Sequence, residues 1–281
     1  MRTLVHLSDL HFGRTDPAVV AALPSTVAAI RPDVTVVSGD LTQRAKAKEF
    51  EQARAFLDGL PAPKIVVPGN HDVPLYRVWE RFLSPLGKYL RYIQDDLNPC
   101  FIDDEIAVLG INTARSLTFK NGRINQGQMR AIHQRFDPLP EHLTKIVVTH
   151  HPFDLPDEPD NAELVGRARQ AMKVFADCGV DLLLAGHFHT TQAGDTSGRH
   201  ELPGYSALVV QAGTATSTRG RGESNSFNVV RVDGPAIAVE TWAWQPERSG
   251  FFAARVDRFA REGARWVERG GAAPAGQPAP S

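Results

Sequence analysis

One stretch, Val66-Val67-Pro68-Gly69-Asn70-His71-Asp72, joins a short apolar run to a glycine and three polar residues. A short run of this kind, rich in Val, Ile and Leu, is typical of a buried strand. The same pattern, an apolar run that ends in side chains able to bind a metal ion, recurs at Val5–His11, Val36–Asp40, Ile146–His151 and Leu183–His189. The sequence therefore predicts five strands that each end in potential metal ligands.

Strands and helices are expected to alternate over the first two thirds of the chain. Apolar runs predict strands at 3–7, 34–38, 64–67, 106–111, 145–149 and 181–185, and helical periodicity predicts helices at 17–30, 46–60, 126–136 and 164–178. This alternation indicates βαβ units and a largely parallel sheet. Closely spaced strands at 208–211, 226–232, 237–244 and 251–261 favour a second, more antiparallel sheet packed on the first.

Two segments stand outside this core. Residues 75–93 carry apolar side chains at helical spacing, broken at Ser84-Pro85, which predicts two short helices within a cap insertion at 75–100. The polar face is basic, with Arg77, Arg81, Lys88 and Arg91 against Glu80. A cap on the core and a homodimer contact both fit this pattern. So does recognition of an anionic substrate or a lipid headgroup by these basic side chains with Trp79 and Tyr89, the apolar face then contacting a membrane surface. Residues 1–269 are expected to form one domain and 270–281 a disordered tail.

The composition excludes several classes of protein. The chain has 281 residues, a formal net charge of −1 and only two cysteines, so neither a disulfide framework nor a thiolate-rich zinc site is expected. The charge balance argues against a dedicated nucleic-acid binder. No run approaches the ~20 apolar residues of a membrane span. The first 14 residues do not resemble a signal peptide, and we expect a cytoplasmic enzyme.

The polar strand ends predict a metal site. Ligands of an open α/β sheet sit beyond the carboxyl ends of its strands, where these five tips would meet. Asp, Asn and His offer oxygen and nitrogen ligands suited to manganese, iron or zinc. A glycine precedes the ligand in three of the motifs, and we expect positive φ angles and close approach there. Each motif alone has a simpler interpretation, since Asp often caps a helix and Gly-Asp often forms a turn, but six of ten histidines cluster in these motifs.

The motifs together resemble a known family. Asp9-x-His11, Gly39-Asp40, Gly69-Asn70-His71-Asp72, His150-His151-Pro152 and Gly186-His187-x-His189 are similar in order and spacing to those of calcineurin-like metallophosphoesterases. They look most like the branch of class III cyclic-nucleotide phosphodiesterases and glycerophosphodiesterases. The resemblance implies a four-layer α/β/β/α sandwich with two mixed sheets and a small helical cap insertion.

The resemblance also implies two ligand sets for two divalent transition-metal ions, with Asp40 as the bridge. The first set is Asp9, His11, Asp40 and His189, and the second is Asp40, Asn70, His150 and His187. His151 would lie behind the ligands. Manganese or iron is expected, with zinc as a further choice. The chain has Ala45 where the family often has glycine, five residues after the bridging aspartate, a difference in a turn rather than in a ligand.

The remaining roles follow from the same resemblance. His71 would contact the phosphoryl group and protonate the leaving oxygen, and Asp72 would hold the His71 ring. Arg44 and Arg115 are the nearby candidates for binding substrate. His6 is assigned to the core.

The expected reaction is hydrolysis of a small-molecule phosphodiester, with in-line attack by a hydroxide that bridges the metals. Two divalent ions, two carboxylates and one hydroxide leave a charge of about +1, which suits a singly charged diester. Open alternatives are a pyrophosphatase acting on a nucleotide- or lipid-linked diphosphate, a nuclease, and a metal-binding scaffold without turnover.

Overall fold

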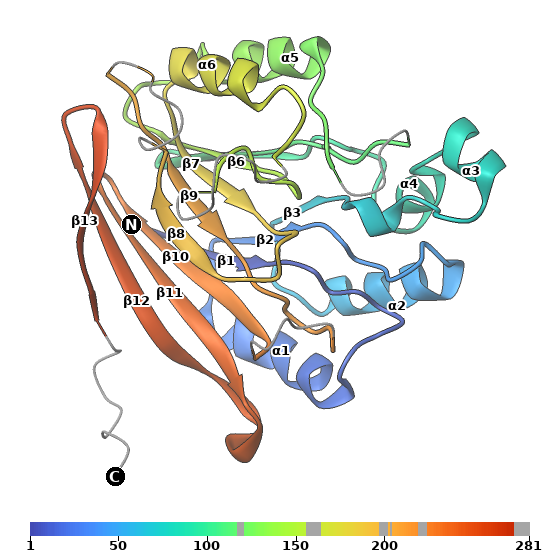
Figure 1. Ribbon diagram of the computed structural model, residues 1–281. Helices are drawn as coiled ribbons and strands as arrows, with labels where there is room; N and C mark the ends of the chain where they lie inside the picture. The colour runs from blue at the N-terminus through green and yellow to red at the C-terminus, as the bar shows by residue number, and fades with distance from the viewer. Residues whose placement is uncertain (117–120, 156–163, 197–201, 203, 219–223, 273–281) are drawn as a thin grey trace.

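Two sheets lie face to face between two layers of helices in the computed structural model (Figure 1). The structure describes residues 1–116, 121–155, 164–196, 202, 204–218 and 224–272. The first sheet has the strand order β13-β12-β11-β10-β1-β2-β3, and the second has the order β4-β5-β6-β7-β9-β8. Both sheets are mixed. In the first sheet the parallel strands β1, β2 and β3 form one end and the antiparallel strands β10–β13 the other, whereas in the second sheet the parallel strands β5, β6, β7 and β9 lie between the antiparallel edge strands β4 and β8.

The bounds of the elements follow chain order. The strands of the first sheet are β1 (Arg2–Leu7), β2 (Val34–Ser38), β3 (Lys64–Val67), β10 (Ser226–Asp233), β11 (Ala236–Gln245), β12 (Gly250–Glu262) and β13 (Arg265–Ala272). Those of the second are β4 (Cys100–Ile102), β5 (Ile106–Gly110), β6 (Thr144–Val148), β7 (Val180–Ala185), β8 (Gln192–Asp195) and β9 (Leu208–Gln211). The helices are α1 (Pro17–Ile30), α2 (Ala47–Asp58), α3 (Val78–Leu83), α4 (Gly87–Tyr92), α5 (Gln126–Phe136) and α6 (Ala168–Cys178), with short 3₁₀ turns at Asn70–Asp72 and Pro246–Arg248.

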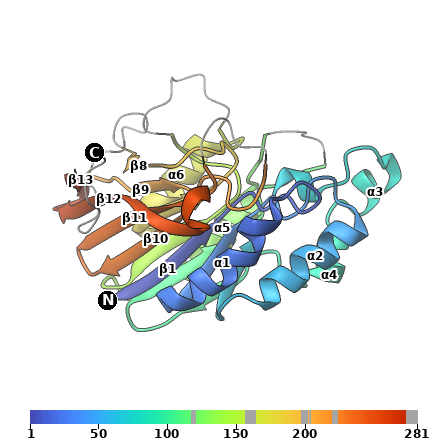
Figure 2. The same ribbon diagram turned by 90° about the horizontal axis from the view of Figure 1, so that it is seen from below.

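Three apolar cores hold the layers together. The middle core lies between the sheets and pairs β1–β3 residues such as Val36 with second-sheet residues such as Ile146. One outer core packs α1 and α2 against the first sheet, for example through Leu23 and Phe50. The other packs α5 and α6 against the second sheet. Figure 2 shows α1 and α2 lying along the face of the first sheet. These cores confirm the expected α/β/β/α sandwich.

The strands divide between the sheets differently from the sequence-based expectation. The late strands β10–β13 do not form a separate antiparallel sheet; they extend the first sheet, because β10 pairs with β1. The second sheet is built from the middle of the chain, and β9 joins it parallel to β7. The unpredicted strands β4, β8 and β13 all lie at sheet edges, where strands are often very short, as β4 and β8 are, or charged, as β13 is. Helix α6 begins at Ala168 rather than at 164.

The expected cap segment and tail can also be located. Residues 75–93 contain the two short helices α3 and α4, while Cys100, expected in the cap, is the first residue of β4. Strand β13 continues to Ala272, so the first three residues of the expected disordered tail belong to the sheet instead. Residues 273–281 lie outside the described residues. None of the helices in the described ranges has the length and apolar character to cross a membrane.

Candidate metal centre

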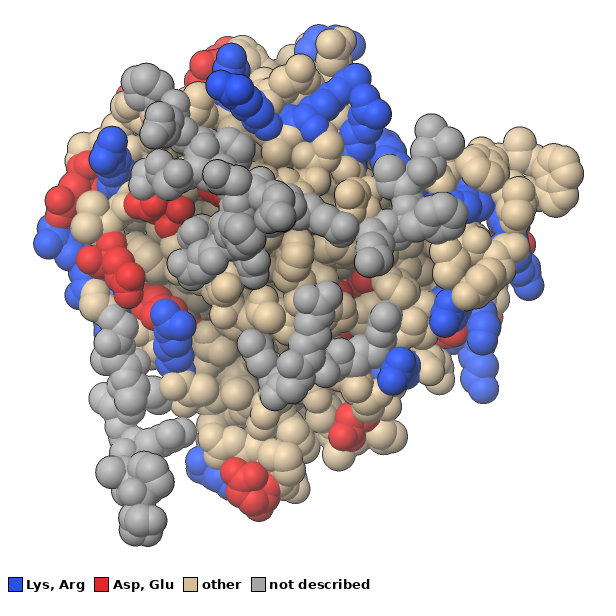
Figure 3. Space-filling view, in the orientation of Figure 1, with Lys and Arg blue, Asp and Glu red and all other residues tan. Residues whose placement is uncertain are grey.

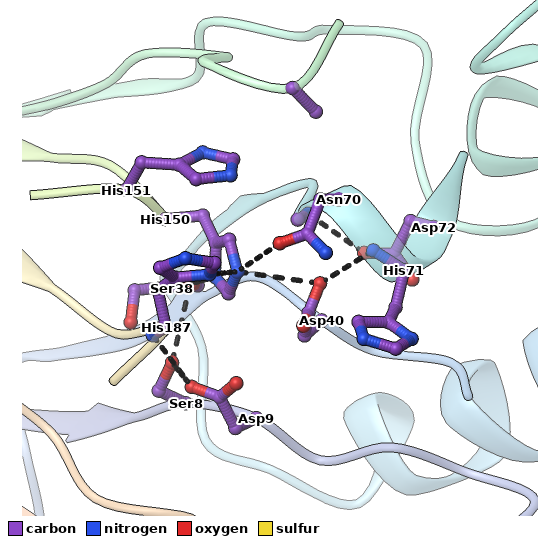
Figure 4. A network of polar contacts seen from close by, with 12 residues as sticks. Ser8, Asp9, Ser38, Asp40, Asn70, His71, Asp72, His150, His151 and His187 are labelled. Carbon is purple, nitrogen blue, oxygen red and sulfur yellow. Dashed lines mark hydrogen bonds and ion pairs between the residues drawn. The ribbon is translucent and has the colours of Figure 1, made fainter. Parts of the chain in front are cut away.

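The polar strand ends meet at one edge of the sandwich. Strands β1, β2 and β3 bring in Asp9, Asp40 and Asn70, and the tips of β6 and β7 bring in His150 and His187 from the other sheet (Figure 4). His150 Nε2 lies 3.2 Å from Asn70 Oδ1 and 3.3 Å from His187 Nδ1. These side chains are far apart in sequence, so the packing of the two sheets creates the cluster.

Asp40 stands between two groups of histidines. Its Oδ2 is 3.7 Å from His11 Nε2, while its Oδ1 is 3.4 Å from His150 Nε2. On the first side, Asp9 Oδ1 lies 3.4 Å from His11 Nε2 and 3.6 Å from His189 Nε2. The seven expected ligands are thus together, and Asp40 offers one oxygen to each side.

Several ligands have a left-handed backbone, which L-residues rarely adopt. The φ angles are 53° at Asp9, 48° at His11, 50° at Asp40, 80° at His187 and 61° at His189. Asp, Asn and His are the non-glycine residues that tolerate this region best. Such strain persists only where the surrounding structure holds it, and it concentrates at functional sites. The backbone is therefore bent to aim these side chains into one space.

The glycines before the ligands serve two purposes, which corrects the expectation of positive φ at all three. Only Gly39 has a positive φ, of 91°. Gly69 is extended, with φ −103° and ψ −176°. A Cβ at Gly69 would overlap Asp40 Oδ1, and a Cβ at Gly186 would overlap Ser8 Oγ. Gly69 and Gly186 are therefore needed for space beside the aspartates rather than for their backbone angles.

Hydrogen bonds from behind orient the histidines. His150 Nδ1 lies 2.8 Å from the Ser38 carbonyl, which can only accept, so Nδ1 carries a proton and Nε2 faces the cluster (Figure 4). His189 Nδ1 lies 2.5 Å from Thr214 Oγ1, which leaves Nε2 toward Asp9. A hydrogen bond of this kind fixes the tautomer of a metal-binding histidine.

The residues fit a pair of metal ions. Asp9 Oδ1 is buried, and no described residue gives it a hydrogen bond. Two of the clusters able to hold an ion are Asp9 with His11 and His189, and Asp9 with Asp40 and His150. Oxygen and imidazole donors without thiolates suit manganese, iron or zinc.

The charges of the cluster compensate one another without a metal. Burial opposes the ionised form of Asp40, but His150 and His71 outweigh it and hold the pKa of Asp40 well below its usual range. Burial likewise lowers the pKa of His150, yet Asp40 and Asp9 raise it to about 9. Burial, with help from His150, brings the pKa of His187 down to about 4. The aspartates thus create a field that attracts a cation.

The family model described as calcineurin-like phosphoesterase matches residues 2–191, which include all seven expected ligands. The chain belongs to the calcineurin-like phosphoesterase family. The family is named for phosphoesterases, so the chain is a hydrolase of phosphate esters.

Curated relatives of this phosphoesterase include three differently named enzymes. The glycerophosphodiester phosphodiesterase GpdQ of Enterobacter lignolyticus is 34% identical over 122 residues, 37% of this chain and 44% of GpdQ. The UDP-2,3-diacylglucosamine pyrophosphatase LpxG of Chlamydia trachomatis is 34% identical over 76 residues, 26% of this chain and 23% of LpxG. The 3',5'-cyclic adenosine monophosphate phosphodiesterase CpdA of Escherichia coli is 24% identical, over 73% of this chain and 76% of CpdA. The chain thus spans less than half the length of the first two relatives.

Solved structures agree with the fold. A dimetal phosphatase from Danio rerio superposes with a TM-score of 0.63 at 15% identity, covering 85% of this chain and 95% of that one. A purple acid phosphatase from yellow lupin superposes with a TM-score of 0.67 at 11% identity, covering 90% of this chain and 52% of that one. At these identities the likeness shows a shared fold.

His71 and Asp72 of this phosphoesterase do not interact as expected. His71 Nδ1 lies 2.9 Å from the Gln43 carbonyl. The Asp72 carboxylate accepts from the backbone N–H groups of Gly69, Leu41 and Thr42 at 2.9–3.2 Å. Asp72 therefore ties the β3 tip to the β2 tip, and Gln43 holds the ring that Asp72 was expected to hold. Every residue has a backbone carbonyl, so neither periodicity nor motif spacing could predict that the carbonyl of Gln43 is the partner of His71.

His151 lies beside His150 and His187, and a ring nitrogen of each of these three histidines is close enough to the others to hold an ion together. Its ring centroid is 4.7 Å from that of His187, and its Nδ1 lies 2.9 Å from Thr113 Oγ1. Thr113 and Thr214 both orient histidines of the cluster, but no motif in the sequence singled them out.

The two arginine candidates have different surroundings. Arg44 Nη1 donates to Tyr76 Oη at 2.9 Å. Arg44 directly follows Gln43, whose carbonyl contacts the His71 ring. Arg115 donates to the Arg123 carbonyl and to Gln128 at the start of α5, and none of its described bonds reaches the cluster. Arg44 is thus beside the centre, while Arg115 braces a helix.

Proposed function

We propose that this protein hydrolyses small-molecule phosphodiesters with two divalent metal ions. The observation that carries the proposal is the position of Asp40, whose two carboxylate oxygens face His11 on one side and His150 on the other. A carboxylate placed in this way would be shared by the two ions. Such a pair activates a water molecule near neutral pH and neutralises charge on the phosphoryl oxygens.

The chain's own residues would then supply positioning and a proton. Asp9, His11, Asp40 and His189 would hold one ion, and Asp40, Asn70, His150 and His187 the other. His71 Nδ1 donates to the Gln43 carbonyl, so the doubly protonated ring would give the proton on its opposite nitrogen, Nε2, to the leaving oxygen and remain as the neutral Nδ1–H form. The His71 ring stands edge-on to the ring of His11, an expected ligand of the first ion, at 4.9 Å between centroids. Asp72 would act by fixing the loop that carries His71.

A diester is favoured over a monoester by the names of the relatives. Of the two arginine candidates for binding substrate, Arg115 is committed to α5. GpdQ and CpdA are both named as phosphodiesterases, whereas LpxG is named as a pyrophosphatase. A nucleotide- or lipid-linked diphosphate is therefore the second candidate, since it would use the same metals and differ in the surrounding pocket.

Metal reconstitution tests the proposal. Protein stripped with a chelator should regain hydrolysis of bis(p-nitrophenyl) phosphate with added Mn²⁺ or Fe²⁺, and to a lesser degree with Zn²⁺. Elemental analysis should find two ions per chain in the active form. Full activity of the stripped protein, or one ion per active chain, contradicts the two-metal account. Parallel assays with cyclic AMP and a nucleoside diphosphate sugar separate a diesterase from a pyrophosphatase.

A second proposal concerns the exposed side chains around α3. The exposed fractions are 80% for Trp79, 78% for Leu83, 60% for Val78 and 53% for Phe82, so four of the six residues of α3 present large apolar side chains to solvent. An exposed apolar patch of this kind often marks an interaction site. The end of the molecule at α3 is largely uncharged, with basic side chains beside it (Figure 3). Exposed apolar residues beside basic ones fit an anionic membrane surface.

Vesicle flotation distinguishes this membrane contact from a homodimer. The protein should float with phosphatidylserine vesicles and not with neutral ones, and Trp79→Ser with Leu83→Ser should abolish the binding. Ile102→Ser, which removes an apolar side chain exposed to 47% on β4, is the matched control. No flotation, together with a dimer that the double variant dissociates, would replace the membrane proposal with self-association.

A further inference from the structure

A cavity of about 370 Å³ lies between the loop that follows β2 and the segment that leads into α3. Its walls are Arg44, Ala45, Lys46 and Ala47 on one side and Pro74, Leu75, Tyr76, Arg77 and Lys88 on the other. The aliphatic and aromatic parts line it, and four cationic side chains surround it. A volume of this size accommodates a small organic group.

The cavity is joined to the metal centre by both loops that form it. Arg44 follows the ligand Asp40 by four residues, and Pro74 follows the ligand Asn70 by four. Four residues span at most ~14 Å even when fully extended. The link is shorter through His71, since its ring contacts the carbonyl of Gln43, the residue before Arg44. The cavity therefore lies on the His71 side of the centre.

The charges around the cavity do not cancel. Arg77 and Lys88 share one carboxylate, that of Glu80. Lys46 lies 3.8 Å from Glu49, whose carboxylate also accepts from the backbone of Arg44. This leaves an excess of two positive charges, which favours an anion.

The guanidinium of Arg44 is held in a position from which it could bind an anion. Its guanidinium lies over the Tyr76 ring, 5.4 Å from the centroid, and donates to Tyr76 Oη. In the described part of the chain, no carboxylate forms an ion pair with this guanidinium. A guanidinium fixed on one edge by an aromatic ring keeps its other N–H donors in a set direction.

We propose that this cavity is a subsite for a second anionic group of the substrate. This group would be carried on the leaving group, whose oxygen His71 protonates. The inference rests on the proposed phosphodiesterase function and names its substrate class: diesters whose leaving alcohol or phenol bears a carboxylate or phosphate. Arg44 is the specificity-determining residue, and Tyr76 is the positioning residue that holds it.

A matched pair of substrates tests the subsite. 4-Carboxyphenyl methyl phosphate and the corresponding methyl benzoate ester have leaving groups of similar shape, and they differ in the charge at the far end of the arm. The wild-type protein should prefer the carboxylate in kcat/KM, and Arg44→Gln should lower that preference roughly tenfold, mainly through KM. Tyr76→Phe should lower it by less. Arg130→Gln, at an exposed position on α5 over the other sheet, should keep the preference.

Calorimetric titration of metal-loaded protein with the same two compounds separates the possible failures. Weaker binding of the carboxylate compound to Arg44→Gln, with a thermal unfolding midpoint like that of the wild type, supports the subsite even where turnover is slow. Equal affinity of the wild type for both compounds overturns the subsite while leaving the phosphodiesterase proposal intact. Tight binding with charge preference but no hydrolysis of either compound overturns the phosphodiesterase proposal and retains the anion subsite.

Discussion

The strand tips that form the metal centre and the α3–α4 segment beside them are opposites in packing. Asp9, Asp40 and His150 are at most 1% exposed, and the backbones of Asp9 and Asp40 are left-handed, a conformation that only a rigid surrounding can hold. In α3, Trp79 and Leu83 are about four-fifths exposed. The buried strand tips therefore hold their polar side chains in fixed positions, while the apolar side chains of α3 are open to contact with other molecules.

The largest expected effect comes from removing the bridge. Asp40→Ala takes away the carboxylate shared by the two ligand sets and the acceptor of the His71 N–H, 2.8 Å from Asp40 Oδ1. Bound metal should fall below two ions per chain, and kcat/KM should fall by at least roughly a thousandfold. Elemental analysis and a diesterase assay measure both losses. An Asp40→Ala protein that keeps both ions would show that the tips do not act as one centre.

His71 lies at the border between the two regions. Replacing it by alanine should leave both ions bound and reduce kcat by about 10²–10⁴, the usual contribution of a general acid. The expected loss is smaller for substrates with good leaving groups, such as p-nitrophenolate, because these need less help from a proton. Loss of metal from His71→Ala would instead make this residue part of the ligand set.

The sequence predicted the centre better than its supports. All seven expected ligands follow apolar runs, so their residue types and their positions at strand ends are visible in the chain itself. The partners of those ligands are not: the Gln43 carbonyl that holds His71 belongs to no pattern. The edge strand β8, Gln-Ala-Gly-Asp, has no apolar run and exists through its pairing with β9. Whether a glycine is needed for φ or for space depends on neighbours from distant parts of the chain, as at Gly186.

Gly186 tests the rigidity of the tips directly. Gly186→Ala would push a Cβ into Ser8 Oγ and lie 2.8 Å from Asp9 Oδ2. We expect a loss of about 1–3 kcal/mol in the free energy of unfolding, because overpacked sites must distort. Gly127→Ala at the start of α5, where the nearest atom is 3.2 Å away, is the control and should change stability by less. Urea titration measures both, and equal effects would mean that the tips can yield.

His6 supports the tips from below and makes them sensitive to acid. It is fully buried with Nε2 2.9 Å from Ser38 Oγ, and burial lowers its pKa to about 3. The unfolded chain takes up this proton below its ordinary pKa of about 6.5, whereas the folded protein does not. This contribution to stability is therefore complete above pH ~6.5 and is lost as the pH falls toward 3.

Metal-free His6→Gln should lack that part of the acid sensitivity. Between pH 6 and 4, the free energy of unfolding should decrease with falling pH in both proteins. The slope for the wild type should exceed that for the variant by about 1.4 kcal/mol per pH unit. The histidines of the cluster are common to both proteins, so the difference between the two pH slopes reports on His6 alone. Parallel pH profiles would show that the buried ring is protonated with the rest of the cluster.

The smallest effect is expected at Ala45, on the loop that connects the two regions. Its φ is 51° and its side chain is 2% exposed, so strain and burial oppose each other there. Ala45→Gly should relieve about 1–2 kcal/mol of left-handed strain and lose about 0.8 kcal/mol of methyl burial. Ala47→Gly, in the first turn of α2, should instead cost up to about 1 kcal/mol. A slight stabilisation by Ala45→Gly would show that left-handed strain outweighs burial of the methyl group in this loop. A loss of stability equal to that of Ala47→Gly would mean that packing of the methyl group holds the loop in place.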